Sequence, residues 1–392
     1  MGNLENLQKA SGVGVWDLKE AYKAAGNLRL NIITAGRYGS GVSEIFSRAN
    51  EYFNELGLFS NWENIIAGEE FFNLAKKITN AVTLGSEVSL KELRRFEQLS
   101  YELNIDTNYD AVYINDHAPL IAAQMSAAQK IFRAHLDMSR ANDLAWDFLK
   151  PFIESCEHII FTDPSFHKPL KGDIRYITPT IDPGSPKNHF VPRQDALKVL
   201  KEYKIPADKP IITQVGRFDA MKDPLGVIDA FNLVRQERPC TLILAGGHAQ
   251  DDPQSQQVYQ EALEKAAGSK DIFLLAINRQ DYKIAALQSV SDVILQKSIA
   301  ESFGLAITEA LWKEKPVVAS NIGGIPLQIK DGKTGLLCHD IESCANALLR
   351  LLEDKALGVK LGKNGHSLVR EKFLITSELW QHLPVFKSIM EI

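Results

Sequence analysis

The sequence predicts an α/β protein with two doubly wound parallel sheets, and three observations lead to this prediction. Short apolar runs alternate with amphipathic stretches from about residue 29 onward. The alternation breaks at residues 178–187, where three prolines and a glycine fall within ten residues, and it restarts at residue 210. Short apolar runs between helical patterns are typical of parallel strands covered by helices on both faces. We therefore expect two domains of one kind, joined at this break.

The first half carries strand patterns at residues 30–34, 111–114, 130–134 and 158–161. A glycine-containing loop follows the first of them, and a helical pattern begins at residue 42. Gly39 and Gly41 in this loop would let a backbone approach closely, beside the positive end of the next helix, which suits phosphate. The alternative is an ordinary tight turn. A dinucleotide-binding G-x-G-x-x-G is excluded, because Glu44 stands where the third glycine would be.

The second half carries strand patterns at residues 210–215, 241–245, 272–275, 293–295 and 316–319. Each is followed by a turn, at Gly216, Gly246, Asn278, Ser298 and Asn321 respectively. Parallel strands end at the same edge of their sheet, and ligands of such sheets bind beyond that edge. We therefore expect these turns to lie together around one binding site.

The composition excludes several classes of protein. The chain has 392 residues, 45% hydrophobic and 24% charged, which is ordinary for a globular protein, and its net charge of −5 argues against general nucleic-acid binding. Four scattered cysteines indicate neither a disulfide framework nor a zinc site. The N-terminus lacks a secretory pattern, and no apolar run of about 18 residues spans a membrane. We expect a cytoplasmic protein.

Two carboxylates, Glu301 and Glu309, stand at a strand–turn–helix junction. Residues 292–296 predict a buried strand, and residues 303–304 predict the turn that precedes the next helix. A helix N-terminus offers free backbone N–H groups and a positive dipole end to phosphate, and carboxylates accept hydrogen bonds from sugar hydroxyls. This combination indicates a nucleotide-sugar site. The alternative is that both glutamates only favour the helix dipole and solvent.

Two basic residues, Arg217 and Lys222, follow the first strand of the second half. Fixed cations there could neutralise a diphosphate leaving group, or they could be ordinary surface charges. In the first half, polar clusters end two strand patterns, with Asp116 in one and His135 and Asp137 in the other. Such clusters cap loops or grip the hydroxyls of a sugar. We see no pattern of metal ligands and expect no metal site.

Several runs of the sequence resemble the retaining GT-B glycosyltransferases. They are residues 216–218, 222, 301–305, 309, 316–318, 323–324 and 331–335. Further runs resemble the family of trehalose glycosyltransferring synthases and trehalose phosphorylases, and they are residues 135–139, 212–215, 248–253, 291–296, 308–313 and 373–376. The similarity extends from about Gly39 to the C-terminus.

The resemblance implies a fold and an activity. The fold would be two Rossmann-like domains facing a cleft: residues 1–185 on the acceptor side, completed by a C-terminal helix at 377–392, and residues 186–376 on the nucleotide-sugar side. The enzyme would transfer a hexosyl group, with glucose as the leading candidate, from a nucleotide sugar such as UDP-glucose to a small acceptor, with retention and without a cofactor. The product would be trehalose or an analogue.

The resemblance also implies roles for single residues. Arg217 and Lys222 would bind the donor diphosphate, and Glu301 would hold hydroxyls of the transferred sugar. Asp116 and Asp137 stay candidates, from their place at the strand ends, to hold the acceptor or hydroxyls of that sugar. His135 would stabilise the transition state. The remaining donor contacts would be Glu309 at the ribose, Asn278 near the base, and the backbone of Phe303, Gly304 and Leu305.

Two departures from the resembled pattern bear on the substrates. Ala300 stands where relatives carry a basic residue, and Ser302 stands where they often carry glycine. Donor or acceptor choice is therefore open, and so are two other functions: a disaccharide phosphorylase and a non-catalytic sugar-nucleotide sensor. Residues 1–28 have two alternatives, packing on the sheet or on the partner subunit of a homodimer.

Overall fold

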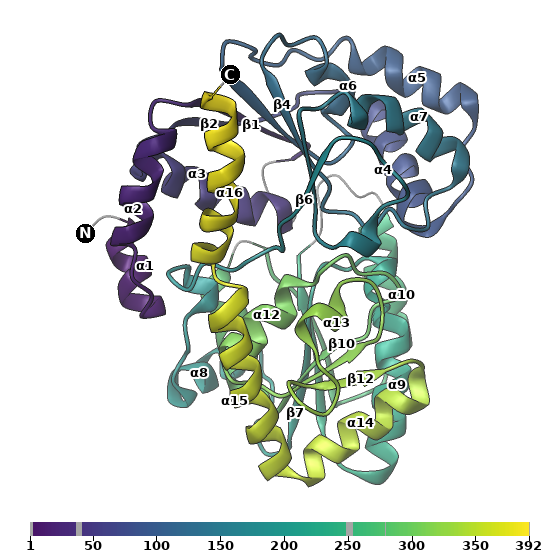
Figure 1. Ribbon diagram of the computed structural model, residues 1–392. Helices are drawn as coiled ribbons and strands as arrows, with labels where there is room; N and C mark the ends of the chain where they lie inside the picture. Colours follow the sequence, from purple (N-terminus) through teal and green to yellow (C-terminus); the bar gives the residue numbers. More distant parts are fainter. Residues whose placement is uncertain (1–2, 37–40, 248–253, 279, 392) are drawn as a thin grey trace. The chain divides into compact units, whose positions relative to one another are not determined.

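The chain folds into two units, here called the first unit (Met1–Thr180 with Ile375–Ile392) and the second unit (Ile181–Leu374). The computed structural model describes residues 3–36, 41–247, 254–278 and 280–391 (Figure 1). Within these residues each unit contains one parallel sheet of six strands. The predicted class, two doubly wound α/β units, is confirmed.

The sheet of the first unit has the strand order β2-β1-β3-β4-β5-β6. Its strands are β1 (Arg29–Thr34), β2 (Phe59–Asn64), β3 (Ala111–Asn115), β4 (Gln129–Arg133), β5 (His158–Phe161) and β6 (Asp173–Tyr176). The sequence did not predict β2 and β6, the two edge strands. Both are polar and largely half-buried or exposed, so neither shows the continuous apolar run of the central strands.

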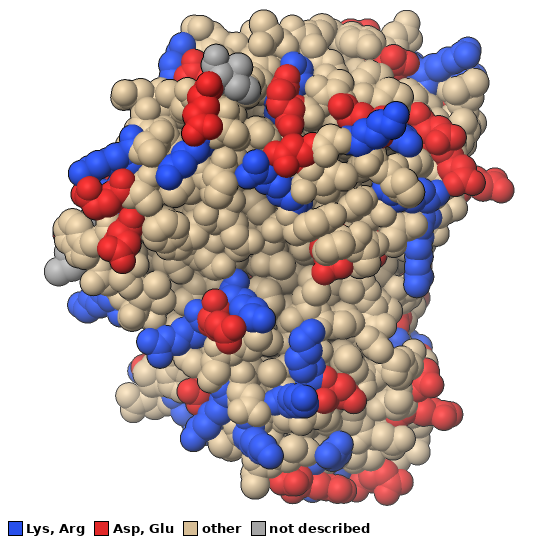
Figure 2. Space-filling model, viewed as in Figure 1, with Lys and Arg blue, Asp and Glu red and all other residues tan. Residues whose placement is uncertain are grey.

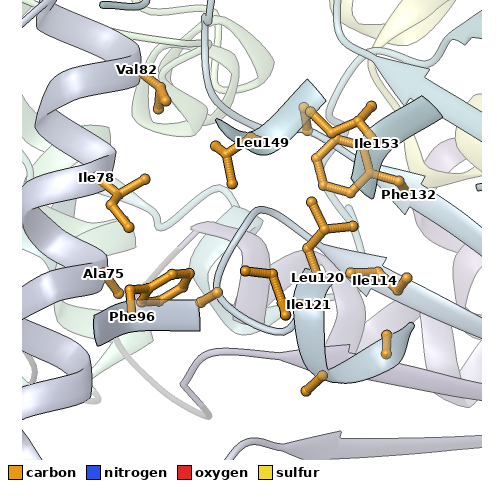
Figure 3. Close-up of a cluster of buried hydrophobic side chains, with 14 of the residues drawn as sticks. Ala75, Ile78, Val82, Phe96, Ile114, Leu120, Ile121, Phe132, Leu149 and Ile153 are labelled. Carbon is orange, nitrogen blue, oxygen red and sulfur yellow. The ribbon is translucent and has the colours of Figure 1, made fainter. Parts of the chain in front are cut away.

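The helices of the first unit cover both sides of this sheet (Figure 1). They are α1 (Asn3–Ser11), α2 (Trp16–Tyr22), α3 (Gly41–Glu55), α4 (Glu69–Leu84), α5 (Leu90–Ser100), α6 (Leu120–Ala123), α7 (Asp143–Glu154) and α16 (Ile375–Met390), with 3-10 turns η1 (Lys23–Ala25) and η2 (Pro164–Phe166). Figure 3 shows one core cluster of the unit, in which α4, α5, α6 and α7 bring apolar side chains against Ile114 of β3 and Phe132 of β4. This burial of both sheet faces accounts for the fully buried central strands.

The sheet of the second unit has the order β12-β11-β10-β7-β8-β9. Its strands are β7 (Ile211–Val215), β8 (Thr241–Gly246), β9 (Ile272–Ala276), β10 (Val293–Gln296), β11 (Val317–Ser320) and β12 (Leu336–Cys338). Thr213 of β7 lies opposite Ile294 on one side and Ile243 on the other, so β7 is central. Alternate residues of β7, β8 and β9 enter two separate apolar cores, as the two-residue period of a strand requires.

Eight α-helices and two 3-10 turns complete the described part of the second unit. They are α8 (Arg193–Glu202), α9 (Pro224–Glu237), α10 (Gln254–Ala266), α11 (Asp281–Val290), α12 (Leu305–Trp312), α13 (Ile325–Gln328), α14 (Ile341–Glu353) and α15 (Lys355–Lys372), with 3-10 turns η3 (Pro186–Asn188) and η4 (Ala220–Lys222). Among the described residues, no helix is both long and apolar enough to cross a membrane.

The C-terminal helix α16 belongs to the first unit, so its predicted return there is confirmed. Glu378 on α16 is fully buried; its carboxylate binds Arg133 of β4 at 2.5 Å and accepts a hydrogen bond from the Thr180 hydroxyl. Tyr22 of α2 donates to the carbonyl of Leu379 at 2.7 Å, which also anchors the N-terminal helices.

The N-terminal helices contact helices α3 and α16 of their own chain and run beside α16 in Figure 1. In this structure the N-terminal helices pack on helices of their own unit. Packing on a partner subunit and a homodimer stay predictions. On the face in view in Figure 2, basic and acidic side chains are interspersed over both units.

Candidate functional site

The turns that follow the strands of the second unit meet closely at the carboxyl edge of its sheet. A side-chain carbon at Gly246, at the end of β8, would lie 1.7 Å from the carbonyl oxygen of Gly216, so only glycine fits. The amide of Gly216 in turn donates to the carbonyl of Ala245 at 3.0 Å. The expected convergence of these turns is therefore observed within the second unit.

The ammonium of Lys222 forms an ion pair with Oε2 of Glu301 at this edge. The two side chains retain 19% and 10% of their exposure, so the pair is largely enclosed but reachable. Ser298 also donates to Oε2 of Glu301, at 3.3 Å. Arg217 is more exposed and lies 3.6 Å from a carboxylate oxygen of Asp219. Two cations and one carboxylate predicted from sequence are thus gathered after β7 and β10.

The backbone around Glu301 rests on the glycine pair that follows β11. A side-chain carbon at Gly323, which has a φ of +48°, would lie 1.9 Å from the carbonyl oxygen of Glu301, and one at Gly324 would lie 2.0 Å from that of Ser302. The amide of Gly324 donates to the carbonyl of Glu301 at 3.1 Å. The glycine pair therefore fixes the position of the Glu301 loop.

The helix α12 begins directly after this loop. Gly304 has a φ of +89°, a conformation that favours glycine, and Leu305 is the first helical residue. Phe303 is buried, packs edge-on against Phe373 at 5.5 Å, and its carbonyl accepts a hydrogen bond from Gln328 at 2.5 Å. This packing holds the start of α12, with its free N–H groups, beside Glu301.

Glu309 lies just over one turn into α12 and is fully buried. Its carboxylate oxygens meet the ammonium of Lys187 at 2.8 Å and the side-chain amide of Gln288 at 3.1 Å. Lys313 binds the other end of the Gln288 amide at 2.9 Å. A ribose could reach Glu309 only if these contacts rearranged, and the predicted ribose role stays a prediction.

Of the other predicted donor residues, two are exposed to solvent and one lies outside the residues that the structure describes. Asn278, after β9, is exposed, and a side-chain carbon at Gly247 would come within 2.4 Å of its Oδ1. Gly41 is the exposed first residue of α3 in the first unit, and Gly39 lies outside the described residues. The phosphate role predicted for this loop is not tested.

The polar clusters predicted in the first unit lie together at the carboxyl ends of β3 and β4. His135 is buried, its Nε2 lies 2.9 Å from Oδ1 of Asn115, and its ring contacts Phe46 edge-on at 5.8 Å. The amide of His135 donates to Oδ1 of Asp116 at 2.7 Å. Asp137 accepts from the amide of Ser139 at 3.0 Å. Asp116 has a φ of +58°, so its backbone is held in the left-handed region.

Burial sets the charge of these groups. Burial, with the nearby Arg133 guanidinium, lowers the pKa of His135 well below its ordinary value, so the imidazole is neutral at physiological pH. Burial raises the pKa of Asp116 to about 7, although the amides of His135 and Leu136 donate to its carboxylate and oppose the rise. His117 is also buried and neutral, because burial lowers its pKa to about 4. In the residues described, no group of three His, Cys, Asp or Glu side chains is arranged to hold a metal ion.

Three residues of the second-unit network were missed by sequence reasoning. Lys297 binds Asp223 and immediately follows β10, so its place after a strand on the binding edge was a usable signal. Lys187 and Gln288 contact Glu309 from distant positions in the chain, and no pattern in the sequence connects them with it.

Comparison with known proteins assigns the chain to a family. Residues 32–168 match the trehalose synthase N-terminal domain, and residues 196–368 match the glycosyl transferases group 1. The trehalose synthase of Thermococcus litoralis is 36% identical over 370 residues, covering 91% of this chain and 89% of the relative. The chain belongs to the trehalose synthase family of GT-B glycosyltransferases.

Other members and structures are consistent with this family and its fold. The trehalose synthase of Rubrobacter xylanophilus is 33% identical, covering 95% of this chain and 94% of the relative. The structure of Anabaena Alr3699/HepE in complex with UDP-glucose has a TM-score of 0.67 at 15% identity, covering 92% of this chain and 100% of that one. At this identity the likeness shows the GT-B fold alone.

Proposed function

We propose that this member of the trehalose synthase family transfers a glucosyl group from a nucleoside diphosphate glucose to glucose, with retention of configuration, to form trehalose. The observation that carries the proposal is the Lys222–Glu301 pair. The side chain of Glu301 lies beside Gly304 at the start of α12, and Arg217 stands in the same loop as Lys222. Cations for a diphosphate and a carboxylate for sugar hydroxyls are what a nucleotide-sugar donor requires.

The enclosed position of Lys222 supports its role at the diphosphate. An ammonium has three donors, and only part of that capacity is used by Glu301, so the others are available to phosphate oxygens. Arg217, which is more exposed, adds a second positive charge. UDP-glucose is the first donor to test, because a neighbour of the same fold is described in complex with it.

The reaction that we propose needs no carboxylate nucleophile. The bond between the anomeric carbon and the diphosphate oxygen breaks, and a bond from the acceptor oxygen to that carbon forms on the same face. The acceptor proton passes to an oxygen of the leaving diphosphate, whose charge Arg217 and Lys222 balance. The neutral imidazole of His135, at the carboxyl end of β4 in the first unit, stays a candidate for contact with the transferred sugar.

The test is nucleotide release from UDP-, ADP-, GDP- and TDP-glucose, each with and without glucose. The proposal expects release that depends on glucose, and a fall of at least about 100-fold in kcat/KM for Lys222→Met and for Glu301→Gln. Lys355→Met is the matched control, since Lys355 pairs with Asp292 at an exposed position of the same unit. Unchanged activity in both site variants would refute the site.

Two other outcomes would assign a different function. Cleavage of trehalose that requires inorganic phosphate, without nucleotide release from any donor, would indicate a phosphorylase. Tight nucleotide binding without turnover for any acceptor would indicate a sugar-nucleotide sensor.

A further inference from the structure

Besides the Lys222–Glu301 pair itself, three hydrogen bonds and one ion pair connect the loop that carries Lys222 with the loop that carries Glu301. The amide of Ile299 donates to the carbonyl of Met221 at 2.7 Å. The side-chain amide of Gln214 donates to the carbonyl of Lys222 at 2.8 Å and accepts from the amide of Lys297 at 2.9 Å. The ammonium of Lys297 forms an ion pair with Asp223. These contacts therefore fix the positions of the two loops relative to each other.

The ion pair between Lys297 and Asp223 is the only one of these contacts made by two charged side chains. The side chains retain 12% and 16% of their exposure, so the pair is shielded from solvent and from salt. Asp223 binds with both oxygens: one meets Lys297, and the other accepts from the amide of Gly226 at 2.9 Å, which caps α9. The carboxylate thereby ties the start of α9 to the end of β10.

The backbone around this pair is shaped to let the charges meet. Asp223 has a φ of +47°, in the left-handed region that is strained for a residue with a side chain. A side-chain carbon at Gly226 would lie 2.2 Å from Oδ2 of Asp223 and 2.7 Å from Nζ of Lys297, so any other residue at position 226 would separate the pair. The left-handed backbone of Asp223 and the glycine at position 226 therefore both allow the ion pair between Asp223 and Lys297 to form.

Lys222 directly precedes Asp223, and its own carbonyl is bound by Gln214. The Lys297–Asp223 pair therefore helps to fix the backbone from which the side chain of Lys222 reaches Glu301. We propose that Lys297 and Asp223 are positioning residues, which hold the Lys222 ammonium beside Glu301 and at the donor diphosphate. This inference rests on the proposed function.

The competing explanation is that Lys297 meets the ligand itself. Lys297 also lines a cavity of about 310 Å³ at the carboxyl ends of β10, β11 and β12, together with residues such as Asn321 and Asp340. A direct contact and a positioning role predict different results when Lys222 is absent. A positioning residue that acts through Lys222 loses its effect with Lys222, whereas a direct contact keeps it.

The experiment is a double-mutant cycle on the full chain with Lys297→Met, Lys222→Met and both together. Each variant is titrated calorimetrically with whichever of UDP, ADP, GDP and TDP the wild type binds most tightly, and kcat and KM are measured with the matching glucose donor. We expect Lys297→Met alone to lower kcat/KM by roughly 10- to 100-fold. In the Lys222→Met background the same substitution should change it by less than about twofold.

A second variant separates positioning from folding. Lys297→Gln combined with Asp223→Asn leaves no unpaired charge, and the amide oxygen at position 223 can still cap Gly226. We expect this variant to keep the melting temperature of the wild type and to lose donor affinity to the extent that Lys297→Met does. Wild-type affinity in this variant would overturn the proposal.

The remaining outcomes distinguish the inference from the function on which it rests. A full effect of Lys297→Met in the Lys222→Met background would overturn the positioning role and leave the proposed function intact. Normal activity of Lys222→Met, or no nucleotide binding by the wild type, would refute the proposed site and the inference with it.

Discussion

Removing the buried carboxylate of Glu378 is expected to destabilise the first unit strongly. Glu378 and Arg133 have 0% and 1% of their side chains exposed, and they meet at 2.5 Å. The second carboxylate oxygen accepts from Thr180, and the guanidinium also lies over the ring of Phe46, 5.5 Å from its centroid. In Glu378→Leu the guanidinium would keep its charge and lose its only ion-pair partner among the described residues.

An unpaired buried charge costs about 3–5 kcal/mol when its partner is removed. For a unit of this size, 1 kcal/mol lowers the melting temperature by roughly 2–4 °C, so the expected loss is roughly 6–20 °C. The assay is differential scanning calorimetry of the full chain. The matched control is Glu70→Leu, since Glu70 pairs with Arg95 on the surface of the same unit, and there we expect little change.

The double variant Glu378→Leu, Arg133→Met tests the physical reasoning. It removes both charges and fills the site with apolar groups, so most of the lost stability should return. If the double variant melted as low as Glu378→Leu alone, the uncompensated charge would not be the cause and the reasoning would be refuted.

Three further predictions follow from the contacts and charges of the two units. Burial keeps His117, His135 and His382 neutral in the folded state, with pKa values below their ordinary value, so the unfolded chain binds more protons below about pH 6.5. The first unit should therefore lose up to about 1.4 kcal/mol per histidine for each pH unit below this, opposed by the carboxyls of Asp116 and Glu63, whose pKa values burial raises. Chemical denaturation from pH 7 to 5 checks it, and a gain in stability would contradict it. Gly324→Ala should displace the Glu301 backbone and lower kcat/KM by at least about tenfold. Gly14→Ala is the control and should not lower it, because a side-chain carbon at position 14 would have no atom within 4 Å. Equal activity of the two variants would disprove the role of the close contact between Gly324 and the Glu301 loop. Lys187→Met should destabilise the second unit by roughly 1–3 kcal/mol, since the buried Glu309 carboxylate loses its ion-pair partner, and Lys187→Met with Glu309→Gln should recover part of this loss in urea denaturation. No recovery would argue against the ion pair.

The sequence was sufficient to predict elements that are buried on both faces. Strands such as β7 and β10 are mostly apolar and buried along their whole length, and their order along the chain, with turns at their carboxyl ends, predicted that Lys222 and Glu301 lie near one edge. The edge strands β2 and β6 were missed because their side chains are half-buried or exposed, so neither strand needs a continuous apolar run.

The partners of the buried charges could not be predicted in the same way. Glu309 was expected at the ribose, yet its contacts are Lys187 and Gln288, which depend on how η3 and α11 pack against α12. Side-chain pairing of that kind is set by the three-dimensional packing of helices, and residue spacing carries no information about it. The same holds for Lys297 and Asp223, whose meeting requires the glycine at position 226.

The most direct test of the central claim is the anomeric configuration of the product. The wild-type chain is incubated with UDP-glucose, or with the glucose donor that the panel selects, and with glucose labelled with carbon-13 at the anomeric position. The account predicts a non-reducing disaccharide with both anomeric centres α, seen by NMR as the donor is consumed. A product with an inverted donor centre, or donor consumption without any disaccharide, would contradict it.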